Sequence, residues 1–271
     1  MISCKSRFEL QRMRAANALV ADVLGELRGI VDEGVTTREL DAIAEDRVRT
    51  AGAIPAFKGY HGYPATLCTS VNEEVVHGIP SGRRLRNGDI VSIDLGVVLN
   101  DYYGDAAVTL PVGTISEDAE MLLHVTEQAL ARSIAQVRLG GHISDLGHAV
   151  QRHVEAHGYS VVREFVGHGI GTSLHEEPQV PNYGEPGQGP RLLEGMVLAI
   201  EPMVSMGKPG VRVLRDGWTA VTQDGSLAAH FEHSVAVTAD GPLVLSRPHQ
   251  AADAPGDGAA APTTWALVDG V

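Results

Sequence analysis

The sequence is poor in aromatic residues and in cysteine. Phe, Trp and Tyr together make up 4% of the 271 residues, so Val, Leu, Ile and Ala are expected to form most of the core. Cys4 and Cys68 are far apart and provide no disulfide framework, which indicates a reducing compartment. No apolar run approaches the roughly 20 residues of a membrane span, and Arg7, Glu9 and Arg12 interrupt the region where a signal peptide would be apolar. We therefore expect a cytoplasmic protein that does not enter a membrane.

Positive charge is also scarce. The chain has 21 Lys and Arg residues against 34 Asp and Glu residues, for a formal net charge of −13 at pH 7. Wide contact with a phosphate backbone needs Lys and Arg, so nucleic-acid specificity is not expected. The local basic cluster of Arg83, Arg84 and Arg86 is interpreted as a solvated turn.

Two helices are predicted at the N-terminus, followed by strands. Ser6 and Glu9 have the spacing of a capping box, and apolar residues then recur at mostly helical spacing as far as Gly29. Thr36 and Glu39 repeat this pattern and predict a second helix that ends near residue 52. Strand patterns follow at 66–71, 89–99 and 102–112.

The same order of elements then begins again. Ser116 predicts a helix to about residue 137, and Ser144 predicts another to about residue 157. Strand patterns follow at 161–166, 196–206, 211–214, 217–223 and 230–237, with hairpin turns at 216–217 and 224–225. The repetition predicts an α/β (α+β) protein with two similar halves around one sheet. Residues 1–246 would form one domain, and 247–271, rich in Ala, Gly, Pro and Asp, a flexible tail.

Two acids are predicted to share one face of a hairpin. Asp94 alternates with the apolar residues of its strand, and a turn near 99–101 folds the next strand back with Asp105 on it. Depending on the register, Asp94 lies opposite either Asp105 or Ala107. Both registers place the β-carbons of Asp94 and Asp105 roughly 4.5–8 Å apart on one face. Such a pair must share a proton, be strongly solvated or hold a cation.

Two further acids and one histidine join this pair. Glu201 ends a very apolar strand pattern, Glu232 alternates with apolar residues, and His168 lies between glycines that permit close backbone approach. Four acids and one His suit Mn, Fe, Co or Zn, and four carboxylates suit two ions about 3.5–4 Å apart. Four other histidines are interpreted as ordinary surface or core residues: His124, His148, His153 and His157.

Six short segments carry a family resemblance. In order and spacing over about residues 6–245, the chain resembles the type I methionine aminopeptidases at 93–95, 103–105, 167–171, 175–178, 200–203 and 232–234. The resemblance implies the pita-bread fold, in which pseudo-twofold helix-helix-strand halves surround a curved antiparallel sheet. It also implies that 1–246 is a catalytic domain that removes the N-terminal methionine from nascent polypeptides, preferentially when the second residue is small and uncharged.

The resemblance also assigns the metal ligands and the catalytic residues. It implies metal ligation by Asp94, Asp105, His168, Glu201 and Glu232. Asp94 would bind one ion, His168 and Glu201 the other, and the remaining two acids would bridge them. A water acidified by both ions would be the nucleophile, with Glu201 as the general base. His175 would stabilise the carbonyl oxygen, and His77 would contact the peptide nitrogen.

The resemblance extends to a pocket for the methionine side chain. Tyr60, Tyr63, Cys68 and Trp218 match the segments that line this pocket, where polarizable contacts suit a thioether; the two tyrosines are alternatively plain core residues. Phe57 and Leu174 depart from the residues that often occupy its edge. A monovalent cation site near Asn72 and a contact with the ribosome remain open, and a monomer is the default.

Two alternative functions are compatible with the same fold. Xaa-Pro peptidases share the fold and the ligands but usually carry an additional N-terminal domain, whereas the first predicted ligand here is already Asp94. A metal-free pita-bread protein that binds a protein or a nucleic acid would generally have lost ligands, and all five are present.

Overall fold

The computed structural model describes residues 2–247 of the chain. Its helices are α1 (Arg7–Arg28), α2 (Thr37–Thr50), α3 (Glu117–Ile134) and α4 (Ile143–Ala156), with a short 3₁₀ helix η1 (Tyr60–Gly62). Its strands are β1 (Ile54–Pro55), β2 (Leu67–Val71), β3 (Glu74–Val76), β4 (Ile90–Leu99), β5 (Tyr102–Pro111), β6 (Ser160–Val161), β7 (Gly167–Gly169), β8 (Glu176–Val180), β9 (Val197–Ile200), β10 (Met203–Ser205), β11 (Val211–Val213), β12 (Ala220–Thr222), β13 (Ala228–His230), β14 (Glu232–Thr238) and β15 (Gly241–Val244). Apart from Arg247, the tail expected at 247–271 lies outside the described residues. Within them, no helix is long and apolar enough to cross a bilayer.

The first two helices begin where their capping boxes predict. The Glu9 carboxylate accepts the backbone N–H of Ser6 at 2.7 Å, and the Ser6 hydroxyl accepts that of Glu9. Thr36 and Glu39 make the same exchange at the start of α2. Each box satisfies amides that a helix leaves unpaired at its N-terminus. The predicted end of α1 at Gly29 is confirmed as well.

The predicted start of α4 was wrong by two residues. The N-cap is His142, whose backbone N–H donates to the Asp145 carboxylate at 2.9 Å. The Ser144 hydroxyl instead accepts the backbone N–H of Gln188 at 2.7 Å. An acid three residues after the cap here replaces the hydroxyl as the signal for the helix start.

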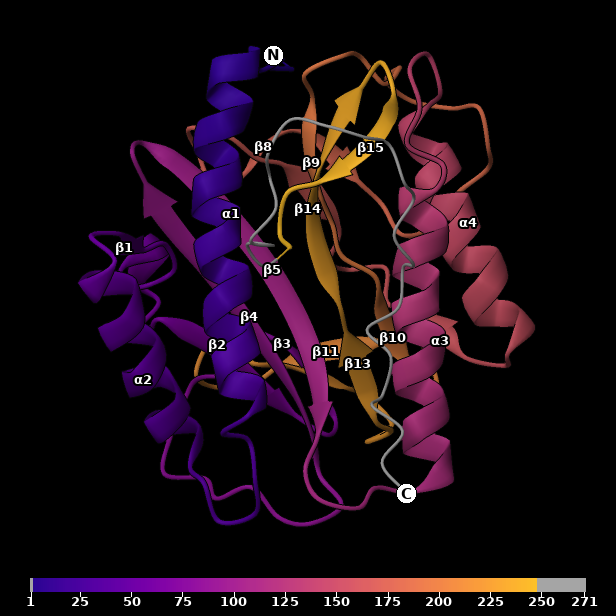
Figure 1. Ribbon diagram of the computed structural model, residues 1–271. Coiled ribbons are helices and arrows are strands. Elements are labelled where there is room, and N and C mark those ends of the chain that lie inside the picture. The colour runs from indigo at the N-terminus through magenta and orange to yellow at the C-terminus, as the bar shows by residue number, and fades with distance from the viewer. Residues whose placement is uncertain (1, 248–271) are drawn as a thin grey trace, which may run out of the picture.

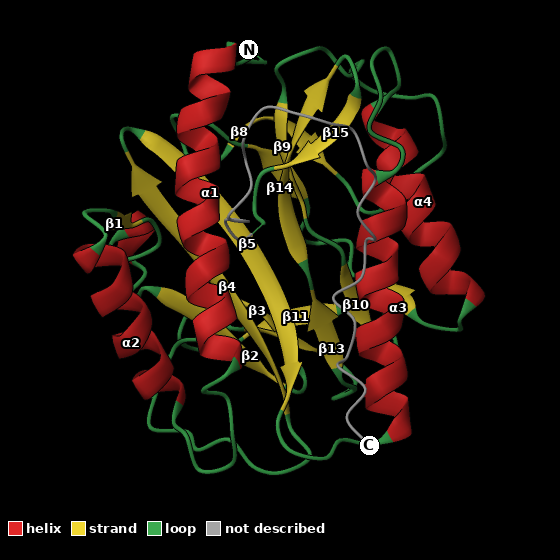
Figure 2. Cartoon of the chain, viewed as in Figure 1, coloured by secondary structure: helices red, strands yellow, loops and turns green. Residues whose placement is uncertain are grey.

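One antiparallel sheet dominates the described residues. Its strands lie in the order β1-β4-β5-β14-β9-β7-β8, and β2 and β15 pair with β4 and β14. Figure 1 shows α1 and α2 on one side of the molecule, α3 and α4 on the other, and β4, β5 and β14 between them. One hydrophobic cluster packs α1 and α2 against β4 and β5, and another packs α3 and α4 against β9 and β14. The predicted duplicated α/β architecture is confirmed, and Figure 2 shows its two helix pairs in red around the yellow sheet.

The turn of the β4–β5 hairpin shows which of the two predicted registers of Asp94 and Asp105 is correct. Asn100 and Asp101 form its two-residue turn, with φ values of 52° and 69°. Asp94 therefore pairs with Ala107, and Asp105 pairs with Gly96. The two acids are diagonal neighbours on one face of the sheet.

Several strand predictions were wrong in the second half. The stretch 196–206 divides after Glu201, because Pro202 has no N–H to continue a ladder; β9 stays in the large sheet, and β10 pairs with β13 and β6. Of 161–166, only Val161 lies in a strand, and β7, β8 and β15 were not predicted. In the first half, β1 and β3 were not predicted either. The turn at 216–217 joins the paired strands β11 and β12, as expected. The turn at 224–225 leads from β12 to β13, which belong to different sheets and form no hairpin.

Candidate metal centre

Neighbouring strands bring the five predicted ligands together. Asp94 and Asp105 lie on β4 and β5, Glu232 begins β14, His168 is the middle residue of β7, and Glu201 directly follows β9. Since β4, β5, β14, β9 and β7 are consecutive in the sheet, residues distant in sequence meet across short inter-strand steps.

His168 lies among the acids. Its Nε2 is 3.5 Å from Glu201 Oε1 and 3.9 Å from Asp105 Oδ2. Asp105, His168 and Glu232 each offer one ligand atom, and these three atoms lie within 4.8 Å of one another. The His168 Nδ1 lies 2.9 Å from the Gly169 carbonyl, which can only accept a hydrogen bond. Nδ1 is therefore protonated and Nε2 presents its lone pair, the arrangement typical of metal-binding histidines.

Burial disfavours ionisation of these carboxyl groups in the absence of a cation. Desolvation raises the pKa of Glu201 to about 8, and desolvation and the charge of Glu201 raise that of Asp94 to about 7, against a lowering effect of His230. Desolvation and the neighbouring acids hold the pKa values of Asp105 and Glu232 well above their usual range. Such an acid cluster is favourable only with shared protons or bound cations.

The polar atoms of the centre fit a divalent metal. Asp94 Oδ1, Asp105 Oδ1 and Glu232 Oε1 are buried and have no hydrogen-bond partner among the described residues. A buried unpaired polar atom costs about 1–3 kcal/mol, which a cation bound between the carboxylates would remove. One imidazole and several carboxylate oxygens are suitable ligands for borderline divalent ions.

His175 lies next to this centre, and His77 lies close enough to His175 and His230 for both to affect its pKa. The His175 ring is 4.3 Å from the His168 ring, and its Nδ1 is 2.7 Å from the Tyr60 hydroxyl oxygen. His77 has a left-handed backbone, with φ of 62°. Burial lowers the pKa of His77 to about 4 and lowers that of His175, aided by His61. Both imidazoles are therefore neutral at pH 7.

The predicted pocket residues form one apolar cluster. Tyr63 and Cys68 share it with Phe57 and Leu174, and Tyr60 and Trp218 pack against it. The rings of Tyr63 and Trp218 are 5.1 Å apart, edge to face. The Tyr63 hydroxyl lies 3.0 Å from the carbonyls of Leu67 and Gly78, which fixes the ring in place.

Three residues near the site were not predicted. His230 Nε2 is 3.7 Å from Glu201 Oε2, and Asn182 donates to the Glu201 carbonyl at 3.0 Å. Lys5 forms an ion pair with Glu176, the residue after His175. The alternation of His230 with Glu232 was the available signal for His230; nothing in the local sequence indicates the other two contacts.

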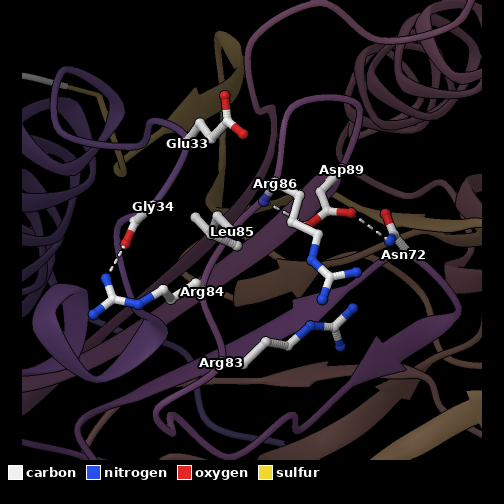
Figure 3. A pocket seen from close by; sticks show the side chains of 8 residues that line it. All are labelled: Glu33, Gly34, Asn72, Arg83, Arg84, Leu85, Arg86 and Asp89. Carbon is white, nitrogen blue, oxygen red and sulfur yellow. Dashed lines mark hydrogen bonds between the residues drawn. The ribbon is translucent and has the colours of Figure 1, made fainter.

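The arginine cluster is separate from this centre. Arg83, Arg84 and Arg86 line a surface depression of about 680 Å³ together with Glu33, Gly34, Asn72, Leu85 and Asp89 (Figure 3). Arg83 donates to Glu74, and Arg84 to the Gly34 carbonyl. Both acids and arginines line the depression, which agrees with a solvated turn. Asn72 donates to Asp89 and accepts the N–H of Ile90, and a cation site near it stays a prediction.

The chain is similar to curated proteins over nearly its whole length. It is 52% identical over 247 residues to the methionine aminopeptidase 1 of Bacillus subtilis, covering 91% of this chain and 100% of the relative. The methionine aminopeptidase of Clostridium acetobutylicum is 51% identical over 247 residues, 91% of this chain and 99% of the relative.

Solved structures agree in fold. The methionine aminopeptidase of Thermotoga maritima superposes with a TM-score of 0.90 at 46% identity, covering 91% of this chain and all of the other. The prolidase of Pyrococcus horikoshii, with a TM-score of 0.72 and 24% identity over 92% of this chain and 64% of its own, shares the fold alone. The profile described as metallopeptidase family M24 matches residues 11–239. The chain belongs to metallopeptidase family M24.

Proposed function

We propose that this chain is a methionine aminopeptidase, which hydrolyses the peptide bond after an N-terminal methionine with divalent metal ions. The observation that carries the proposal is the convergence of buried carboxylates with unpaired oxygens on His168. The chain is identical to methionine aminopeptidases at about half of the aligned residues, over nearly the full length of those proteins, and this supports the same activity.

The proposed metal ligands are the five residues of the centre: Asp94, Asp105, His168, Glu201 and Glu232. Their mixture of carboxylate oxygens and an imidazole nitrogen is suited to Co, Mn, Fe or Zn. When bound, such ions would acidify a water and polarise the scissile carbonyl.

Glu201 is the proposed general base. Its Oε1 faces His168 and its Oε2 faces His230, so the carboxylate is held at the centre with both oxygens directed to other site residues. A carboxylate in this position can take a proton from the attacking water and return it to the leaving amine.

His175 is proposed to donate a hydrogen bond to the substrate carbonyl as negative charge develops there. The donor must be Nε2–H, so Nδ1 must accept, and its partner at 2.7 Å is the hydroxyl of Tyr60. Tyr60 thereby fixes the tautomer that His175 needs. His77 is proposed to contact the peptide nitrogen on the leaving side.

The apolar cluster of Tyr63, Cys68 and Trp218 is proposed to hold the methionine side chain, because polarizable apolar contacts suit a thioether. A small, uncharged second residue is the proposed preference of the adjoining subsite. We further propose that the enzyme acts in the cytoplasm on nascent chains and does so as a monomer.

Substrate choice tests this function directly. The chain should cleave Met-Ala-Ser and leave Ala-Pro intact, with hydrolysis followed by release of free methionine or alanine. Cleavage of Ala-Pro alone would make the chain an Xaa-Pro peptidase. Absence of cleavage with every added metal would favour a binding protein of the same fold.

A further inference from the structure

His230 is a buried histidine with a rigidly held backbone. It is 2% exposed and ends β13, two residues before β14 begins. Its N–H donates to the Thr109 hydroxyl at 2.9 Å, and the same hydroxyl donates to the His230 carbonyl at 2.7 Å. Ser92 lies 2.8 Å from this hydroxyl on the neighbouring strand. This network ties His230 to β5 and β4, the strands that carry Asp105 and Asp94.

The His230 imidazole faces the carboxylate of Glu201. Its Nε2 is 3.7 Å from Oε2, while the other oxygen of the same carboxylate is 3.5 Å from His168 Nε2. Glu201 thus lies between two imidazoles, with one oxygen toward each. Ligand atoms that share an ion at about 2.0–2.2 Å lie no more than roughly 4.4 Å apart, and both separations meet this limit.

The His230 imidazole, like the acids around it, has a polar atom without a hydrogen-bond partner. Its Nε2 is buried without a hydrogen-bond partner in the described part of the chain, as are Asp94 Oδ1, Asp105 Oδ1 and Glu232 Oε1. A neutral imidazole nitrogen can form a hydrogen bond with an ionised carboxylate only if that nitrogen carries the ring proton. Even then, the 3.7 Å between His230 Nε2 and Glu201 Oε2 is too long for a hydrogen bond. One cation would satisfy the nitrogen and the oxygens together.

We propose that His230 is a sixth protein ligand of the metal centre and binds through Nε2 beside Glu201. The inference rests on the proposed metal centre and adds a second nitrogen ligand to it. Imidazole favours Zn, Fe and Cu, whereas carboxylate and carbonyl ligands suit Mg and Mn. His230 therefore shifts the selectivity of the centre from Mn toward Zn.

Metal affinity tests this role independently of activity. Chelated full-length protein would be titrated with Zn²⁺ and with Mn²⁺ by calorimetry, for the wild type, His230→Gln and His230→Ala. His153→Gln is the matched control, because His153 Nε2 is also buried without a partner but lies on α4. Zn²⁺ affinity at one site should fall roughly tenfold or more in both His230 variants, Mn²⁺ affinity should fall less, and the control should bind like the wild type.

X-ray absorption of the wild type loaded with two Zn²⁺ gives a second reading that does not depend on any variant folding. It should show two imidazoles per pair of ions, and one imidazole would overturn the proposal. Unchanged affinities in the His230 variants would also overturn it, whether or not their thermal stability or kcat fell. A wild type that binds no metal would instead refute the metal centre itself.

Discussion

Cys68 on β2 lies directly opposite Asp94 on β4 in the antiparallel ladder. A side chain of the proposed methionine pocket and a proposed metal ligand are thus cross-strand neighbours, with β-carbons about 4.5–5.5 Å apart. If both assignments hold, the strand pair β2–β4 sets the distance between the methionine pocket and the metal centre.

A larger residue at position 68 should therefore obstruct the pocket. We expect Cys68→Leu to lower kcat/KM for Met-Ala-Ser by roughly 10–200-fold, because misfits of about one methylene in a pocket have effects of that size. Steady-state kinetics measure it, and Cys4→Leu, at an exposed cysteine, is the control. Equal kinetics in the two variants would show that Cys68 does not line the pocket.

The contact between Tyr60 and His175 should matter for turnover. We expect Tyr60→Phe to lower kcat about tenfold or more, since it removes the group that fixes the His175 tautomer, and donors to a developing oxyanion have effects of up to 10²–10³. Tyr102→Phe removes a hydroxyl that instead donates to Glu9 and should retain wild-type kcat. A wild-type kcat in Tyr60→Phe would show that Tyr60 is a plain core residue without a role in turnover.

Lys5 should stabilise the segment that carries His175. Its ammonium pairs with Glu176, whose Oε1 accepts the N–H groups of Thr172 and Ser173, and the Lys5 side chain is 3% exposed. Lys5→Met would leave the partner carboxylate without its cation, at a cost of about 3–5 kcal/mol. Denaturant unfolding measures this loss, and Lys5→Arg should lose less. A Lys5→Met variant as stable as the wild type would contradict the role.

Protonation of His153 should lower the stability of the fold in acid. Burial, with the positive charge of Arg132, lowers its pKa to about 4 from an ordinary 6.5. A folded-state pKa below the unfolded one gives a contribution that is complete above about pH 6.5 and is lost as the pH falls toward 4. His153→Gln should reduce the decline in melting temperature between these values. An identical pH profile for the variant would show that His153 titrates normally.

Local patterns predicted the part of the fold that depends on local interactions. The capping boxes of α1 and α2 need only residues three apart, and the shared face of Asp94 and Asp105 follows from the two-residue period of a strand. The same period gave both possible registers, and only the turn at Asn100 and Asp101 decided between them.

Longer-range contacts could not be predicted in this way. Glu201 was placed at a strand end, but Pro202 sends the following strand into a different sheet, and His230 meets Glu201 only because β13 pairs with β10 there. Lys5 and Glu176 are 171 positions apart. No periodicity in either segment encodes that contact.

Catalysis is proposed to depend on a metal centre in which Glu201 takes part. The most direct measurement is Met-Ala-Ser hydrolysis by chelated protein as Co, Mn, Fe or Zn is added back, for the wild type, His168→Ala and Glu201→Gln. Activity should be lost on chelation and should return with added metal in the wild type alone. Both variants should keep their fold by circular dichroism. Activity that survives chelation, or normal turnover in either folded variant, would contradict the proposal.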